Sequence, residues 1–164
     1  IHLIFGAHTF EKCVAILHGY NPWKDLIDIE KLNGVIFLLF KPCGSGQELK
    51  ELVPNSYQMK VFSSLIFNPK TSFKIGMDSC LVNHTTKNKK LSDFQEMTMS
   101  TCEAARMSAY ITPDMYMMPC SFADRNKFGV PMIKSIKHIW SKSTVFRMFR
   151  KSLNSNPNQC PLGV

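Results

Sequence analysis

The chain has 164 residues, of which 45% are hydrophobic and 20% are charged, values close to the average for globular proteins. This composition excludes an intrinsically disordered or collagen-like chain, and the longest apolar run, residues 35–40, is far too short for a membrane-spanning helix. The net charge of +8 suits an anionic partner, but the basic residues are scattered along the sequence and form no known nucleic-acid-binding motif.

The ends of the sequence and its cysteines bear on whether the chain is part of a longer protein and on the compartment it occupies. Ile1 already lies in a predicted strand with no signal-peptide layout, and the sequence stops shortly after Cys160 without a closing element, so we expect the chain to be part of a longer protein. Six cysteines are too sparse for a secreted disulfide scaffold, and the ten methionines also favour a reducing compartment. We therefore expect a cytoplasmic protein whose cysteines are buried thiols, a catalytic thiol or metal ligands.

Strands and helices alternate through the first half of the sequence. In chain order we expect a strand over residues 1–5, a helix from Thr9 to about Gly19, a strand over 34–40, a helix over 57–67 and a strand over 73–78. Alternation at this spacing requires right-handed crossovers, and therefore a parallel sheet. Because residues 34–40 are apolar without interruption, we expect this strand to be covered on both faces.

The pattern changes after Cys80. In chain order we expect a polar, turn-rich loop over residues 81–91, a helix opening at 92–95 toward Cys102, a β-hairpin over 107–112 and 115–118 with Pro113 in its turn, a helix beginning at Pro131 and a helix capped by Ser143. The last helix would carry Phe146, Phe149 and Leu153 on its buried face. The second half is therefore predicted as a small α+β unit.

Three cysteines of the second half lie at the ends of predicted elements. Cys102 and Cys120 bracket a helix end and the hairpin, and Cys160 lies in a loop before a proline. Thiolates at such positions can converge on a soft metal site, whereas the alternative is three unconnected small apolar side chains. Cys13 falls on an apolar helix face, which predicts a core residue, and Cys43 is assigned no role.

Longer stretches resemble a known family. Residues 101–122, TCEAARMSAYITPDMYMMPCSF, resemble the start of the SPASM or twitch domain of radical S-adenosylmethionine enzymes, in which a Cys precedes a hairpin that ends in Pro-Cys. Residues 136–150 resemble the same domain's Ile-x-x-Ile-Trp and Phe-Arg stretch, and NQCP at 158–161 resembles its final Cys-x-x-Cys. Upstream, residues 32–46 and 73–80 resemble the late strands of the superfamily's partial (β/α)6 barrel.

The resemblance implies an α/β fold class with two parts. Residues 1–82 would form the last three β/α units of the partial (β/α)6 barrel, and residues 83–164 a small α+β twitch- or SPASM-like domain with a β-hairpin and helices. One departure is Met115, which replaces the hairpin glycine, so we expect the turn to close without the usual positive φ.

By this resemblance, the second part would bind an auxiliary [4Fe-4S] cluster through Cys102, Cys120 and Cys160. The family's last Cys position is occupied by Gly163, which cannot be a ligand. The fourth ligand could come from a residue beyond 164, which we favour, from Cys80, or from a substrate bound to an open iron.

The complete enzyme, by the same resemblance, would cleave S-adenosylmethionine at a second [4Fe-4S] cluster to give a 5′-deoxyadenosyl radical. That radical would abstract hydrogen from a peptide or small-molecule substrate, with an electron donor such as flavodoxin or ferredoxin. The catalytic Cys-x-x-x-Cys-x-x-Cys loop is absent from these 164 residues, so we expect this chain alone to be inactive.

Several polar residues remain as weaker candidates. Parallel barrels place function at the carboxyl ends of strands, and four residues are at or near such ends, although loop or structural roles are favoured: His8, Lys41, Ser45 and Asp78. His84 and His138 are expected to be surface or packing residues.

Two other function classes stay open. A non-enzymatic zinc module could use the same cysteines, but zinc sites normally have two close Cys-x-x-Cys pairs and this sequence has none. A basic nucleic-acid-binding protein would show strongly salt-dependent affinity, and we expect only weak, nonspecific binding. No membrane partner is expected.

Overall fold

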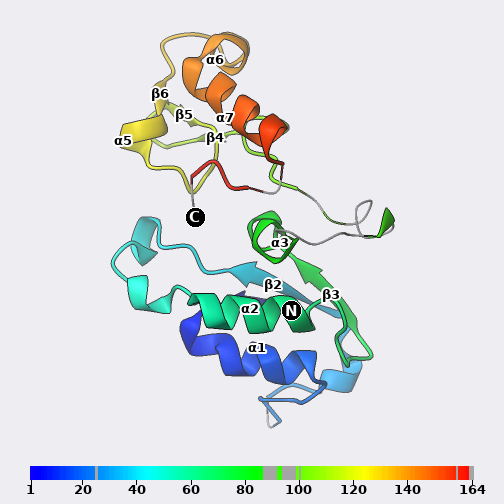
Figure 1. Ribbon diagram of the computed structural model, residues 1–164. Coiled ribbons are helices and arrows are strands. Elements are labelled where there is room, and N and C mark those ends of the chain that lie inside the picture. Colours follow the sequence, from blue (N-terminus) through cyan, green and yellow to red (C-terminus); the bar gives the residue numbers. More distant parts are fainter. Residues whose placement is uncertain (25, 87–91, 94–98, 100, 158, 163–164) are drawn as a thin grey trace.

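The computed structural model describes residues 1–164 except 25, 87–91, 94–98, 100, 158 and 163–164. Figure 1 shows two halves, which we call the N-terminal half (residues 1–86) and the C-terminal half (residues 101–162). Each half has its own three-stranded sheet. None of the described helices is long and apolar enough to cross a membrane.

A parallel sheet organises the N-terminal half. Its strands β1 (His2–Phe5), β2 (Gly34–Leu39) and β3 (Lys74–Met77) lie in the order β1-β2-β3 and are all parallel. Helix α1 (Phe10–Leu17) connects β1 to β2, and helix α2 (Ser56–Leu65) connects β2 to β3. The predicted alternation and the parallel pairing are confirmed. Four short 3-10 turns lie in the connections: η1 (Ala7–Thr9), η2 (Ile29–Lys31), η3 (Gly44–Gly46) and η4 (Lys50–Leu52).

The helix ends follow local capping chemistry. At the start of α2, Asn55 and Gln58 form a reciprocal capping box, with the Gln58 N–H donating to Asn55 Oδ1 at 2.9 Å. Thr9 precedes α1 as predicted, but its hydroxyl caps no helical N–H and instead donates to the Ile4 carbonyl at 2.6 Å. Gly19 ends this segment with φ of +81°, a conformation that only glycine adopts without strain.

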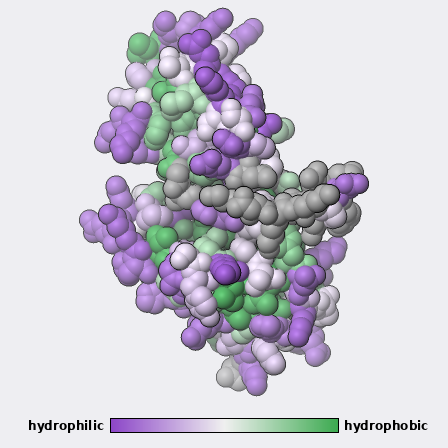
Figure 2. Space-filling model, in the orientation of Figure 1, coloured by the Kyte–Doolittle hydropathy of each residue, from purple (hydrophilic) through white to green (hydrophobic). Residues whose placement is uncertain are grey.

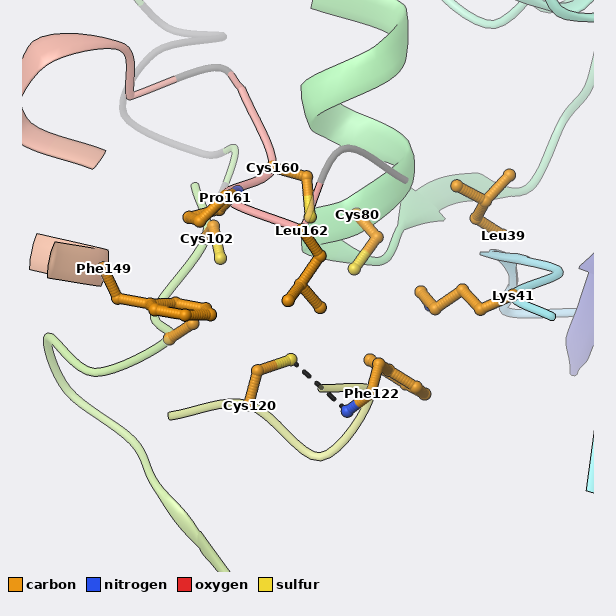
Figure 3. Close-up of a pocket in the computed structure, with 11 residues that line it drawn as sticks. Leu39, Lys41, Cys80, Cys102, Cys120, Phe122, Phe149, Cys160, Pro161 and Leu162 are labelled. Atoms are coloured by element: carbon orange, nitrogen blue, oxygen red, sulfur yellow. Dashed lines mark hydrogen bonds between the residues drawn. The ribbon is translucent and has the colours of Figure 1, made fainter. Parts of the chain in front are cut away.

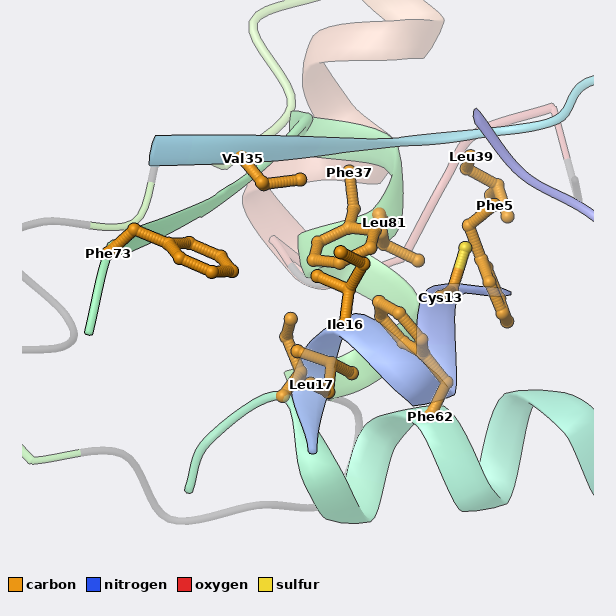
Figure 4. Close-up of a cluster of buried hydrophobic side chains, with 11 residues drawn as sticks. Phe5, Cys13, Ile16, Leu17, Val35, Phe37, Leu39, Phe62, Phe73 and Leu81 are labelled. Carbon is orange, nitrogen blue, oxygen red and sulfur yellow. The ribbon is translucent and has the colours of Figure 1, made fainter. Parts of the chain in front are cut away.

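The core of the N-terminal half is aromatic (Figure 4). Phe62 of α2 stacks on Phe5 with ring centroids 4.1 Å apart and meets Phe37 edge to face at 5.1 Å. Cys13 of α1 is fully buried in the same core, which confirms its prediction as a core residue. These contacts fix α1 and α2 on one face of the sheet.

The opposite face of this sheet differs from the prediction. Along β2, Val35 and Phe37 are buried, whereas Ile36 between them is 40% exposed. Ile4 of β1 is 52% exposed. Within the described residues, the sheet is therefore covered on one face only. A continuous apolar run is consistent with burial of one face or of both faces. The sequence alone therefore could not show how many faces of this strand are covered.

The expectation of a loop over residues 81–91 is wrong for its first part, because residues Ser79–Thr86 form helix α3. Asp78 begins this helix, since its Oδ1 accepts the Leu81 N–H at 2.8 Å. Leu81 and Val82 are buried, and the Thr86 hydroxyl donates to the Val82 carbonyl at 2.8 Å. Tertiary burial and a side-chain cap thus override a composition that is poor in helix formers. The helix expected to open at residues 92–95 lies mostly outside the described residues.

An antiparallel sheet organises the C-terminal half. Strands β4 (Tyr110–Ile111) and β5 (Tyr116–Met118) form the predicted hairpin, and β6 (Val130–Pro131) pairs with β5. Pro131 therefore lies in a strand, so the prediction that it begins a helix is wrong. The helix α6 (Ile136–Lys142) begins later, after Ser135, whose Oγ accepts the His138 N–H at 3.3 Å.

Helix α7 (Thr144–Ser155) supplies the core of this half, and the short α5 (Arg125–Phe128) packs beside it. Phe146, Phe149 and Leu153 are buried, as predicted. Arg150 donates to the carbonyls of Ala105 at 3.0 Å and Trp140 at 2.7 Å, which joins α7 to the turn before the hairpin and to α6.

The hairpin turn corrects the expectation for Met115. This residue has φ of +62°, so the turn does use the left-handed conformation, with a methionine in it. The Met115 N–H donates to the Thr112 carbonyl at 2.9 Å, which closes the turn with Pro113 at its second position. A side chain in this conformation carries a steric cost of roughly 1 kcal/mol.

Replacing Met115 with glycine relieves this cost. We expect Met115→Gly to raise the free energy of unfolding by roughly 0.5–1 kcal/mol, measured by chemical denaturation, because Met115 is 57% exposed and loses little packing. The matched control is Met148→Gly within α7, which should lower it by about 1 kcal/mol. A loss of stability in Met115→Gly would contradict the strain argument.

The Cys13 thiol makes stability depend on alkaline pH. Burial raises the pKa of Cys13 from 9.0 to about 12. A pKa that is higher in the folded state contributes stability below pH 9, and this contribution is lost as pH rises toward 12. We expect the wild type to lose more unfolding free energy between pH 9 and 11 than Cys13→Ala, measured by denaturation at each pH. Parallel profiles for the two proteins would contradict this prediction.

Candidate metal centre

One apolar pocket lies between the two halves. The N-terminal half contributes Leu39, Lys41 and Cys80, and the C-terminal half contributes the other lining residues: Cys102, Ala104, Cys120, Phe122, Phe149, Cys160, Pro161 and Leu162. Four of the six cysteines of the chain therefore line the same pocket. None of the four is in a disulfide.

Each cysteine comes from a different segment of the chain. Cys80 is the second residue of α3, Cys102 precedes a turn closed on the Glu103 carbonyl, Cys120 follows β5, and Cys160 follows α7. In Figure 3 these four side chains are arranged around that of Leu162. The structure thus brings Cys80 to the three cysteines singled out in the C-terminal half.

Burial favours the neutral thiol form of Cys80, Cys102 and Cys120 when no metal is bound. Burial raises the pKa of Cys80 to about 12 and also raises the pKa values of Cys102 and Cys120. Backbone N–H groups oppose this effect, because Phe122 N–H donates to Cys120 Sγ at 3.5 Å and a hydrogen bond from Ala104 lowers the pKa of Cys102. Binding a metal as thiolates therefore releases protons.

A buried ion pair borders the pocket. Lys41 Nζ lies 2.5 Å from Asp78 Oδ2, and the two side chains are 8% and 20% exposed. The ammonium also lies over the Phe122 ring, 4.3 Å from its centroid. Lys41 and Asp78 thus lie next to the cysteines. The sequence marked them only as weaker candidates, because they lie at or near strand ends.

The remaining candidates lie elsewhere. His8 in η1 and His138 in α6 are exposed, His84 in α3 is half-buried, and Ser45 lies in η3. Cys43 is half-buried just before η3. Neither Cys43 nor any of these three histidines lines the pocket that holds the four cysteines.

The arrangement of the cysteines bears on whether the site suits a single metal ion or an iron–sulfur cluster. Among the described residues, no three His, Cys, Asp or Glu side chains converge closely enough to hold a single metal ion. Sulfurs around one tetrahedral zinc would lie only about 3.8 Å apart, given Zn–S bonds of about 2.3 Å. A [4Fe-4S] cluster instead takes four Cys thiolates, one on each iron, and four cysteines line this pocket.

The pocket is nearly filled. Its free volume is about 20 Å³, space for one or two water molecules, so a four-iron cluster needs side chains to move. Leu162 is the side chain in the centre of the four cysteines, and it is only partly buried in the C-terminal core. The donor set therefore fits an iron–sulfur cluster once Leu162 moves aside.

The comparisons with known proteins agree with this donor chemistry. Residues 102–161 match the family model of SPASM, an iron-sulfur cluster-binding domain. The resemblance stated for this part of the sequence is thereby confirmed. The SPASM match includes Cys102, Cys120 and Cys160 and leaves Cys80 outside. No curated protein and no solved structure matches the chain.

Sequence reasoning missed two residues of this site. Phe122 and Leu162 each follow a candidate cysteine by two residues, and this proximity was the only signal for them. Gly163, the position expected for a last cysteine, lies outside the described residues.

Shortening Leu162 should make cluster assembly easier. We expect Leu162→Ala to take up iron and sulfide several-fold faster during anaerobic reconstitution, followed by absorbance near 400 nm, roughly the region of iron–sulfur charge transfer. Leu153→Ala is the control, since it opens space in the same core away from the pocket and should only destabilise the fold, by about 2–5 kcal/mol. Equal uptake rates in the wild type and Leu162→Ala would show that Leu162 does not limit access.

Proposed function

We propose that the chain binds an auxiliary [4Fe-4S] cluster through Cys80, Cys102, Cys120 and Cys160. The observation that carries this proposal is that four thiols from four separate segments of the chain line one pocket. Thiolates are the usual ligands of such clusters, and four of them complete the set. The SPASM match over residues 102–161 supports the same chemistry independently of the geometry.

The proposal assigns the fourth ligand to Cys80 rather than to a residue beyond 164 or to a substrate. Cys80 belongs to the N-terminal half, so the cluster ligands would come from both halves of the chain. When bound, such a cluster supplies one-electron redox chemistry or an iron site for a substrate. The cysteines would hold it, the apolar lining limits water, and Lys41 provides a positive charge that acts on Cys80.

We further propose that the chain is the C-terminal part of a radical S-adenosylmethionine enzyme. The three parallel β/α units agree with the late part of a partial (β/α)6 barrel, and the proposal assigns residues 1–82 to it. S-adenosylmethionine and a second [4Fe-4S] cluster would then be bound by sequence outside this chain. A peptide or small molecule would be the substrate, flavodoxin or ferredoxin the electron donor, and the cytoplasm the location.

Anaerobic reconstitution tests the ligand set. We expect the wild type to become brown, with about four iron and four sulfide per chain. Serine at position 80, 102, 120 or 160 should reduce iron content or change the electron paramagnetic resonance spectrum of the reduced protein, because one iron loses its thiolate. The matched control is Cys43→Ser, a half-buried thiol outside the pocket, which should load like the wild type.

Two outcomes would contradict the proposal in different ways. Colourless protein with one zinc per chain would favour the zinc module. A Cys80→Ser variant with unchanged iron content and spectrum would retain the cluster but remove Cys80 from its ligands.

A further inference from the structure

Lys41 is the only formally charged side chain among the described residues that line the four-cysteine pocket. It directly follows the apolar residues at the end of β2, and its side chain is only 8% exposed. Burying an ammonium group costs several kcal/mol unless it is paired, so a lysine in this place needs compensating contacts.

Two contacts hold the Lys41 ammonium on the pocket wall. Asp78 Oδ2 lies 2.5 Å from Nζ, and the Phe122 ring centroid lies 4.3 Å from it. Phe122 is also the residue whose backbone N–H donates to Cys120 Sγ at 3.5 Å. The lysine therefore joins the N-terminal half to the loop that carries Cys120.

The charge acts on the cysteines themselves. Lys41 interacts electrostatically with Cys80 and Cys120, and Asp78 acts on Cys80 with the opposite sign. Glu103 and Arg106 act on Cys102 with opposite signs. In an apolar pocket these interactions are weakly screened.

We propose that Lys41 is an electrostatic tuning residue of this site: its ammonium, held by Asp78 and Phe122, stabilises negative charge on the sulfur ligands and raises the reduction potential of the cluster they hold. This inference rests on the proposed cluster site. Reduction adds one negative charge to a cluster that four thiolates already make negative, and a nearby cation favours that step. Removing the cation should lower the potential, and removing its carboxylate partner should raise it.

The ion pair offers two variants with opposite expected effects. Lys41→Met keeps an unbranched side chain that is one atom shorter and removes its charge, so we expect a more negative midpoint potential. Asp78→Asn keeps an oxygen that can accept the Leu81 N–H at the start of α3, and we expect a more positive midpoint potential. The control is Lys31→Met, which breaks the exposed Lys31–Asp28 pair on the surface and should leave the potential unchanged.

Redox titration of the reconstituted full chain, followed by electron paramagnetic resonance, measures these shifts. Circular dichroism checks that each variant is folded, and Asp78→Asn decides the question if Lys41→Met does not fold. Potentials that agree with the Lys31→Met control, or that shift in the same direction in both variants, would overturn the inference and leave the cluster site intact. Failure of the wild type to assemble any cluster would overturn the proposed function and this inference with it.

Discussion

The Asp78 carboxylate holds together the parts on which the candidate site depends. One oxygen accepts the Leu81 N–H at 2.8 Å and begins α3, and the other lies 2.5 Å from Lys41 Nζ. The Asp78 backbone N–H donates to the Phe37 carbonyl at 2.9 Å, which ties the end of β3 to β2. Because Cys80 comes two residues later, in the first turn of α3, the position of its thiol depends on this one residue.

The pocket combines groups that are costly to bury separately. The thiols of Cys80, Cys102 and Cys120 avoid this cost by staying protonated, and Lys41 avoids it by pairing with Asp78. When the thiols become metal ligands, their negative charge lies beside an ammonium group in apolar surroundings.

Local rules explain both the successes and the errors of the sequence analysis. The strands and helices of the N-terminal half follow from apolar periodicity, and the hairpin follows from Pro113 in its turn. Helix α3 was missed because its residues are poor helix formers, and the Asp78 cap and buried Leu81 outweigh that preference. Pro131 was misplaced because its preference for helix starts cannot reveal pairing with β5.

The sequence by itself determined the parallel β/α order, the hairpin, and the positions of Cys120 after β5 and Cys160 after α7, since these features depend on neighbours a few residues away. Only the tertiary structure decided that Cys80 shares a pocket with them and that Lys41 lies over Phe122. These residues are far apart in the chain and belong to two halves. No periodicity or capping rule encodes how two such halves pack against each other.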